Sequence, residues 1–321
     1  MDLIFLGTSA GTPTRFRNVS GVAVVEDGGR DWHLVDCGEG TQHQILRTPL
    51  SLHSLHTTFI THVHGDHCFG LPGLIASAGL TGRKHPLNIV GPAALGPWLM
   101  STFTVTACYL PFEVNFSPVE DGGIWASERI RIDATPLSHR VPSHAYRFTE
   151  ARPDPRLDVA RLDREGVPRG PIWGRLMKGE DVDEHGRIYR SADYVLFDRS
   201  PRRIIVAGDN DRPDLLTDAC EGAQVLVHEA TYTREIAKKA GREAGHSAAE
   251  HIATFAARIG LPHLVLTHFS ARYQQGPGRS PSIDAIREEA AACYGGGLFL
   301  AEDLQRYHLD KEGALREVAL S

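Results

Sequence analysis

The segment THVHGDH, at positions 61–67, places four potential metal ligands within six residues: His62, His64, Asp66 and His67. The run Thr57–His64 is predicted to be a strand, and strands of α/β sheets carry ligands at their carboxyl ends. His62 and His64 then point to one face, because side chains alternate along a strand. Gly65 lets the chain turn back, so that Asp66 and His67 reach the same point. Such a set can hold two neighbouring Zn²⁺ ions, whereas the alternative is four unrelated polar residues in a loop.

Two metal ions need further ligands, including a carboxylate that bridges them. Three candidates stand where a strand-like run meets a loop. His139 follows RIRIDATPLS, Asp209 follows RRIIVAG, and His268 follows HLVLT. Any one of them alone is more typical of a core or surface residue, but three at equivalent positions favour a shared site.

Short runs rich in apolar and β-branched residues recur along the chain and predict strands. They are Asp2–Thr8, Gly21–Val25, Trp32–Asp36, Thr57–His64, Leu87–Val90, Arg129–Ala134, Tyr146–Thr149, Arg203–Ala207, Val225–His228 and Leu264–His268. Helical spacing predicts helices over Ser247–Ile259, with Ser247 as a candidate cap, and over Ser282–Tyr294. Two sheets packed face to face, with helices outside, would satisfy this α/β pattern.

Residues 150 to 191 interrupt the pattern with several prolines and glycines and few strand signals. Their basic and acidic residues nearly balance. We expect an inserted arm there, within a single domain that spans 1–321.

Composition excludes several classes of protein. The five cysteines are scattered without a C-x-x-C pair, which argues against a disulfide scaffold and favours the reducing cytoplasm. The N-terminus lacks the basic region of a signal peptide, and no apolar run is long enough for a membrane helix, so we expect no membrane partner. The net charge of −6 excludes a basic field over the whole molecule, although not a local basic patch.

THVHGDH, together with the upstream LVDCGEGT, resembles the metallo-β-lactamase superfamily, and further motifs narrow the resemblance to the ribonuclease Z family. They are FLGTSAGTPTRFRN, DHCFGLPGL, GVPRGPIWGRL, VHEATY, GHSAAE and THFSARY, in family order over nearly the whole chain. The resemblance implies an αββα sandwich with an inserted flexible arm.

The resemblance also implies two zinc ions per subunit. His62, His64 and His139 would hold one ion, Asp66, His67 and His268 the other, and Asp209 would bridge them. The sequence leaves open whether zinc or manganese occupies the site. Asp66 would orient the attacking water or accept its proton. Asp36 would orient a histidine ligand, or alternatively cap the turn Gly38–Gly40.

His246 and Glu229 resemble a family pair in which histidine protonates the leaving 3′-oxygen and glutamate orients that histidine. An alkoxide leaves poorly without such an acid. The alternative is structural: His246 would cap the helix that follows it, and Glu229 would make one buried hydrogen bond.

Substrate contacts are implied for Arg15, Arg17 and Asn18, and for Arg272, which can form a fork onto a phosphate. Without the resemblance, the first three would be a solvated basic turn and Arg272 a surface ion-pair partner. The arm resembles an exosite that grips tRNA. Its basic candidates are Arg156, Arg161, Arg164, Arg169, Arg175 and Lys178, provided that they share a face.

We therefore predict a zinc-dependent endoribonuclease that removes the 3′ trailer from precursor tRNA and leaves a 3′-hydroxyl. The resemblance implies a homodimer in which one subunit's arm holds tRNA at the other's site. The alternatives are a small-molecule phosphodiesterase or another hydrolase of the same fold, and a catalytically inactive RNA-binding scaffold.

Overall fold

The computed structural model describes residues 1–28, 31–274 and 280–320, which form two compact units. Unit 1 comprises Met1–Thr149 and Arg203–Ser321, and unit 2 comprises Glu150–Arg202. Within the described residues, no helix is both long and apolar enough to cross a membrane.

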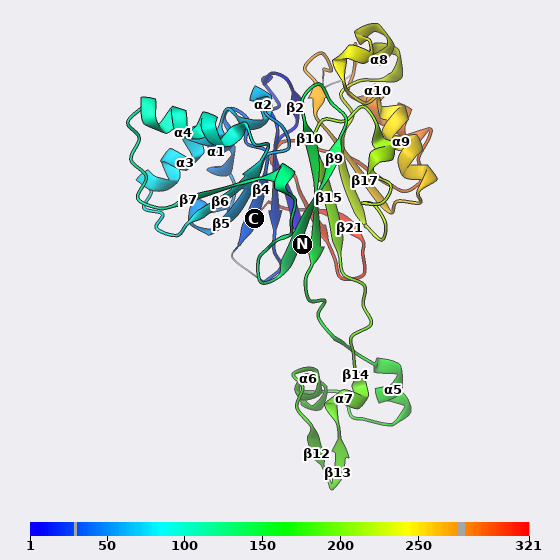
Figure 1. Ribbon diagram of the computed structural model, residues 1–321. Helices are drawn as coiled ribbons and strands as arrows, with labels where there is room; N and C mark the ends of the chain where they lie inside the picture. Colours follow the sequence, from blue (N-terminus) through cyan, green and yellow to red (C-terminus); the bar gives the residue numbers. More distant parts are fainter. Residues whose placement is uncertain (29–30, 275–279, 321) are drawn as a thin grey trace. The chain divides into compact units, whose positions relative to one another are not determined.

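Unit 1 contains two large mixed sheets (Figure 1). The first has the order β21 (Leu315–Val318), β20 (Arg306–Leu309), β1 (Asp2–Gly7), β3 (Gly21–Val25), β4 (Trp32–Val35), β5 (Leu55–Phe59), β6 (Leu87–Gly91) and β7 (Val114–Pro118). The second has the order β19 (Gly297–Leu300), β17 (His263–Thr267), β16 (Val225–Glu229), β15 (Arg203–Ala207), β10 (Ser143–Glu150), β9 (Ile130–Leu137) and β8 (Trp125–Ala126). A small pair joins β2 (Ser9–Ala10) to β18 (Phe269–Ser270).

Helices cover the outer faces of both sheets (Figure 1). The first sheet carries α1 (Thr41–Ile45), α3 (Leu71–Leu80) and α4 (Leu95–Val105), and the short α2 (Gly65–Cys68) lies at its edge. The second carries α9 (Ala249–Arg258) and α10 (Asp284–Ala291), and α8 (Arg234–Ala240) lies above them at the top of the view. The described part of the unit also contains the short 3₁₀ helices η1 (Leu52–Ser54), η2 (Val119–Asp121), η3 (Pro213–Leu216) and η4 (Arg242–Ala244).

The alternation of side chains explains why the central strands are apolar throughout. In β1, Leu3 and Phe5 enter the core between the sheets, whereas Ile4 and Leu6 pack under the helices of the first sheet. In β15, Ile204 and Val206 face the inner core and Ile205 faces the outer one. The predicted two-sheet α/β architecture is confirmed, and each predicted strand lies on a strand of these sheets.

Both predicted helices also form, as α9 and α10. The prediction that Ser247 caps its helix is wrong, because the cap position of α9 is Ala248. The Ser247 hydroxyl instead donates to the Asn210 carbonyl at 2.7 Å, which ties this helix to the loop after β15.

Unit 2 has more regular structure than its sequence predicts. It contains β11 (Arg156–Leu157), α5 (Val159–Arg164), α6 (Pro171–Met177), β12 (Val182–Glu184), β13 (Arg187–Tyr189), α7 (Ser191–Tyr194) and β14 (Val195–Leu196). A small core of its own includes Leu162, Leu176, Val182 and Tyr194. The strands have only two or three residues each, too short for the period of two to show in the sequence.

Candidate metal centre

The loop that carries the metal ligands begins earlier than the sequence predicts. Strand β5 ends at Phe59, so the prediction of a strand through His64 is wrong. The cause is Asp36, whose carboxylate accepts the Thr61 backbone N–H at 2.8 Å and the Thr61 hydroxyl at 2.9 Å. His62 and His64 therefore lie in the loop after β5, while Asp66 and His67 lie on α2.

Two glycines let the segment after β4 pass directly against α2. The Cys37 N–H donates to the His67 carbonyl at 2.8 Å, and the Gly70 N–H donates to the Cys37 carbonyl at 2.9 Å. A Cβ at Gly38 would lie 2.3 Å from the Asp66 carbonyl oxygen, and one at Gly70 would lie 2.0 Å from the Gly38 carbonyl oxygen. Only glycine fits at these positions, which gives the LVDCGEG motif a physical reason.

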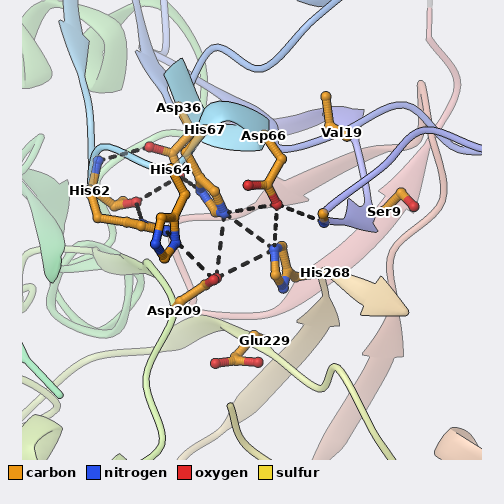
Figure 2. A network of polar contacts seen from close by, with 12 residues as sticks. Ser9, Val19, Asp36, His62, His64, Asp66, His67, Asp209, Glu229 and His268 are labelled. Carbon is orange, nitrogen blue, oxygen red and sulfur yellow. Dashed lines mark hydrogen bonds and ion pairs between the residues drawn. The ribbon is translucent and has the colours of Figure 1, made fainter. Parts of the chain in front are cut away.

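The first group of ligand atoms joins His62, His64 and His139 around one point. Figure 2 shows His62 and His64 of this group. His64 Nδ1 lies 3.0 Å from His62 Nε2 and 3.1 Å from His139 Nε2. Oδ2 of Asp209 lies 3.6 Å from both of those Nε2 atoms.

The second group joins Asp66, His67 and His268. His268 Nε2 lies 3.2 Å from His67 Nε2 and 3.3 Å from Asp66 Oδ2. Oδ1 of Asp209 lies 3.5 Å from His67 Nε2 and 3.4 Å from His268 Nε2. The two oxygens of Asp209 thus face different groups, and Figure 2 shows this carboxylate between the histidines.

Hydrogen bonds at Nδ1 fix four of these histidines with Nε2 toward the centre. Nδ1 of His62 meets the Thr61 hydroxyl at 3.0 Å, and Nδ1 of His67 meets Asp36 Oδ2 at 2.7 Å. Nδ1 of His139 donates to the Gly245 carbonyl at 2.7 Å, and Nδ1 of His268 meets the Thr231 hydroxyl at 3.0 Å. Such partners hold the tautomer and orientation that a metal ligand needs.

This donor set fits zinc. Ligand atoms about 2.0 Å from a tetrahedral Zn²⁺ are separated by roughly 3.3 Å, and the spacings of 3.0 to 3.3 Å within the two groups are close to that value. Imidazole nitrogens and carboxylate oxygens are ligands that zinc accepts.

The carboxylate of Asp36 is bound by Thr61 and His67 and does not cap the turn Gly38–Gly40.

The electrostatics of the centre also favour a bound cation. Burial lowers the pKa of His62, His64 and His139, which keeps these side chains neutral and able to donate lone pairs. Burial opposes a charge on His67, but Asp209, Asp36 and Asp66 raise its pKa to about 10. A cation that binds His67 must therefore displace a proton.

Beside the ligands, the half-buried His246 pairs with the buried Glu229. His246 Nδ1 lies 3.2 Å and 3.1 Å from the two oxygens of Glu229. Burial would lower the pKa of His246, but the charge of Glu229 and this hydrogen bond raise it. The Nε2 atom is left for another partner, and the ring stands 5.1 Å from that of His139 and 5.5 Å from that of His268.

The N-terminal loop presents fewer of its predicted substrate contacts than the sequence suggests. Arg15 is exposed, whereas Arg17 is only 7% exposed. The Arg17 guanidinium donates to the Thr8 hydroxyl at 2.6 Å and to the Ala301 carbonyl at 2.8 Å, so this residue is held in the interior. Asn18 is half-buried, and its backbone N–H donates to Asp303 at 2.6 Å.

Arg272 lies at the surface over the ring of Tyr232, 5.2 Å from the ring centre. Its Nε donates to the Ser270 hydroxyl at 3.0 Å, and no described acid pairs with its guanidinium. The charge of Arg272 is therefore available to a ligand.

Most predicted basic residues of unit 2 are already paired with acids. The pairs are Arg156–Asp198 at 2.7 Å, Arg161–Glu165 at 2.8 Å, Arg169–Asp163 at 2.7 Å and Arg175–Glu180 at 2.9 Å. Arg164 and Lys178 are exposed and lack such a partner among the described residues. Arg152 and Arg190 of this unit are exposed as well, and no ion pair joins either to an acid within the described residues, so unit 2 offers positive charge at four side chains.

Several residues that support the centre have no predicted role in the sequence. The backbone N–H of Gly11 donates to Asp66 Oδ2 at 2.7 Å, and that of Asn210 donates to Glu229 Oε1 at 2.8 Å. The Thr231 hydroxyl contacts both Glu229 and His268. Thr61 and Thr231 stand next to ligand motifs, so their position was a usable signal, but a backbone donor such as Gly11 leaves none.

Comparisons with known proteins agree with this centre. The chain is 56% identical to ribonuclease Z of Pseudomonas putida over 318 residues, which cover 99% of each chain. It is 48% identical to ribonuclease Z of Marinobacter nauticus over 99% of each chain. A family model described as anti-Pycsar protein Apyc1 matches residues 1–100.

Solved structures share the fold. The short form of human tRNase Z matches with a TM-score of 0.67 and 27% identity, covering 97% of this chain and 100% of the human chain. The metallo-β-lactamase fold protein YhfI of Bacillus subtilis matches with a TM-score of 0.65 at 18% identity, covering 95% and 98%. The second match supports the fold alone.

Replacing Asp209 tests the shared carboxylate. Asp209→Ala removes both oxygens that face the two ligand groups, so we expect the purified protein to lose at least one metal ion per chain, together with its hydrolytic activity. Elemental analysis measures the metal content, and Asp218→Ala, at an exposed carboxylate of the same region, is the matched control. Full metal content in Asp209→Ala would contradict the shared-ligand arrangement.

Proposed function

The chain belongs to the ribonuclease Z family, and from this membership we propose how its residues divide the removal of the 3′ trailer from precursor tRNA. The activity is that of a tRNA 3′-processing endonuclease, which leaves a 3′-hydroxyl on the tRNA. The family decides against the small-molecule phosphodiesterase that the shared metal motif alone leaves open.

The observation that carries the proposed mechanism is the sharing of Asp209 between two groups of ligand atoms. His62, His64 and His139 would hold one zinc ion, Asp66, His67 and His268 the other, and Asp209 both. When bound, two zinc ions supply Lewis-acid chemistry that activates water and neutralises charge on phosphate oxygens.

Asp66 would receive the proton of the attacking water. Its Oδ2 lies among the ligand atoms and is held there by the Gly11 N–H. Burial opposes the charge of Asp66, but the charge of protonated His67 and hydrogen bonds lower its pKa. A bound cation that replaces the proton of His67 would keep Asp66 ionised in the same way. Asp36 acts indirectly, because it fixes the ring of His67.

His246 would protonate the leaving 3′-oxygen from Nε2. Glu229 holds Nδ1 and raises the pKa of the ring, so that the proton is present at neutral pH. Glu229 is itself fixed by the Asn210 N–H and the Thr231 hydroxyl. The pair therefore forms an acid whose direction is set by the protein.

Precursor tRNA would be held by exposed cations outside the centre. Arg15 and Arg272 are candidates in unit 1, and Arg164 and Lys178 in unit 2. We assign unit 2 to the role of the remote arm that grips tRNA. The free cysteines fit the reducing cytoplasm as the place of this reaction.

The proposed homodimer has support in an apolar groove of about 620 Å³ along α4 and the segment that follows it. Met100 and Tyr109 line this groove and are largely exposed, which is unusual for large apolar side chains. A second copy of the chain would cover them, and its arm would then serve the first copy's centre.

Removal of the proposed acid should distinguish two substrates. We expect His246→Ala to slow cleavage of precursor tRNA by roughly 10²–10⁴-fold, the usual contribution of a positioned general acid. A diester that releases nitrophenolate should lose much less, because that anion needs no proton. Glu229→Gln should give a weaker form of the same pattern, since it removes the orienting charge and leaves the acid.

Metal content must be measured in parallel. Equal losses on both substrates with the metal retained would mean that His246 positions the phosphate and is not the acid. Loss of metal from His246→Ala would make this residue a ligand and would overturn the proposed ligand set.

Deleting the arm should separate remote binding from chemistry. Thr149 and Arg203 are paired directly across β10 and β15, so an Asn-Gly turn can replace 150–202 and close the hairpin. We expect the deletion to raise KM for precursor tRNA strongly while hydrolysis of the nitrophenyl diester persists, because only remote binding is lost. Equal loss on both substrates would place this segment in the active site or in the core.

A mixture of two defective chains tests the dimer. The arm-deleted chain keeps its metal centre, and His246→Ala keeps its arm. If the arm of one subunit serves the centre of the other, mixed dimers should cleave precursor tRNA with a KM near that of the unmodified protein. Mixing that restores nothing would mean that each arm serves its own centre or that the chain is a monomer.

A further inference from the structure

A cavity of about 700 Å³ opens beside His246 in unit 1. The loop before η3 contributes Asp211 and Arg212, α8 contributes Arg234 and Lys238, and α9 contributes His251. Helix α8 lies at the same edge of the sandwich as α2, which carries two of the metal ligands (Figure 1).

Two cations of this cavity lack acidic partners. Arg234 pairs with Glu250 at 2.7 Å, which neutralises both. Arg212 and Lys238 are exposed, and neither side chain pairs with an acid within the described residues. The one further described acid that lines the cavity is Asp211. Two unpaired cations and one such acid leave the lining with a net positive charge.

His246 separates this cavity from the metal centre. Its ring stands close to those of His139 and His268, and the same residue lines the cavity. Under the proposed function, His246 contacts the oxygen of the nucleotide on the 5′ side of the cleaved bond. The cavity is therefore beside that nucleotide and not beside the trailer.

We propose that Arg212 and Lys238 form a subsite for a backbone phosphate of the RNA strand, on the 5′ side of the cleaved bond. An arginine can form a fork onto a phosphate, and a lysine adds a mobile point charge. The volume lies in the range of roughly 300–1,000 Å³ of pockets that hold small ligands. This subsite rests on the proposed role of His246, and it would fix the strand next to the acid.

The test compares Arg212→Ala and Lys238→Ala with Lys239→Ala. Lys239 is the next residue of α8, but it pairs with Glu235 and does not line the cavity. We expect each cavity variant to raise KM for precursor tRNA roughly 3- to 10-fold and to reduce the slope of log(kcat/KM) against log salt by about 1. The loss on the nitrophenyl diester should be smaller, and Lys239→Ala should match the unmodified protein on both measures.

Trailer length identifies the nucleotide. The cavity variants should raise KM by the same factor for precursors with a one-nucleotide trailer and with a long trailer, because both contain the nucleotides on the 5′ side of the cleaved bond. A penalty confined to the long trailer would assign the cavity to the trailer and overturn the proposal, as would an unchanged KM and salt slope. Equal effects of Lys238→Ala and Lys239→Ala would mean that only the general positive charge of α8 attracts RNA, which would overturn the proposed subsite. Failure of the proposed function would appear in a different experiment: His246→Ala would then lose equal factors of activity on precursor tRNA and on the nitrophenyl diester.

Discussion

The structure depends on placing many metal ligands around a single carboxylate. Asp209 offers one oxygen to each group of histidines, and the buried acids Asp36 and Glu229 stand close by. Such a concentration of carboxylates and lone pairs in a buried site is unfavourable unless cations balance it. The sandwich can bring these ligands together because they follow strands of both sheets at one shared edge. Bound metal would thus hold together segments that come from opposite halves of the sandwich.

Part of the cost of this arrangement lies in the backbone. Asp36 and His268 have φ values of 63° and 57°, a left-handed region that side chains other than glycine seldom adopt. Each such residue costs about 1–3 kcal/mol and persists only where its surroundings fix it. Asp36 is fixed by Thr61 and His67, and His268 by Thr231. Backbone strain is therefore found at Asp36 and His268, where the side chain turns out of the sheet toward the metal centre.

The strands and helices of unit 1 could be predicted because their patterns are local. The period of two predicts the strands, and ligand types at strand ends predict the positions of His139, Asp209 and His268. Prediction from the sequence fails where a residue distant in the chain determines where a strand ends or whether a side chain is exposed. Asp36 captures the Thr61 N–H and ends β5 early, although nothing between 57 and 64 marks that point. Arg17 has the same charge as Arg15, yet contacts with Thr8 and Ala301 take it out of solvent. Ion pairs in unit 2 are equally invisible in composition.

Those ion pairs change how an acidic chain can bind RNA. A net charge of −6 describes the whole molecule, but affinity for phosphate depends on cations that no acid has neutralised. Within the described residues, Arg15, Arg212, Lys238 and Arg272 are such cations in unit 1, whereas most arginines of unit 2 carry their own acids. Arg212 and Lys238 line a cavity at His246 itself. Positive charge is thus available beside His246, and unit 2 adds the exposed cations Arg152, Arg164, Lys178 and Arg190. Under the proposed function, an RNA phosphate would be attracted by these few cations and not by the charge of the whole chain.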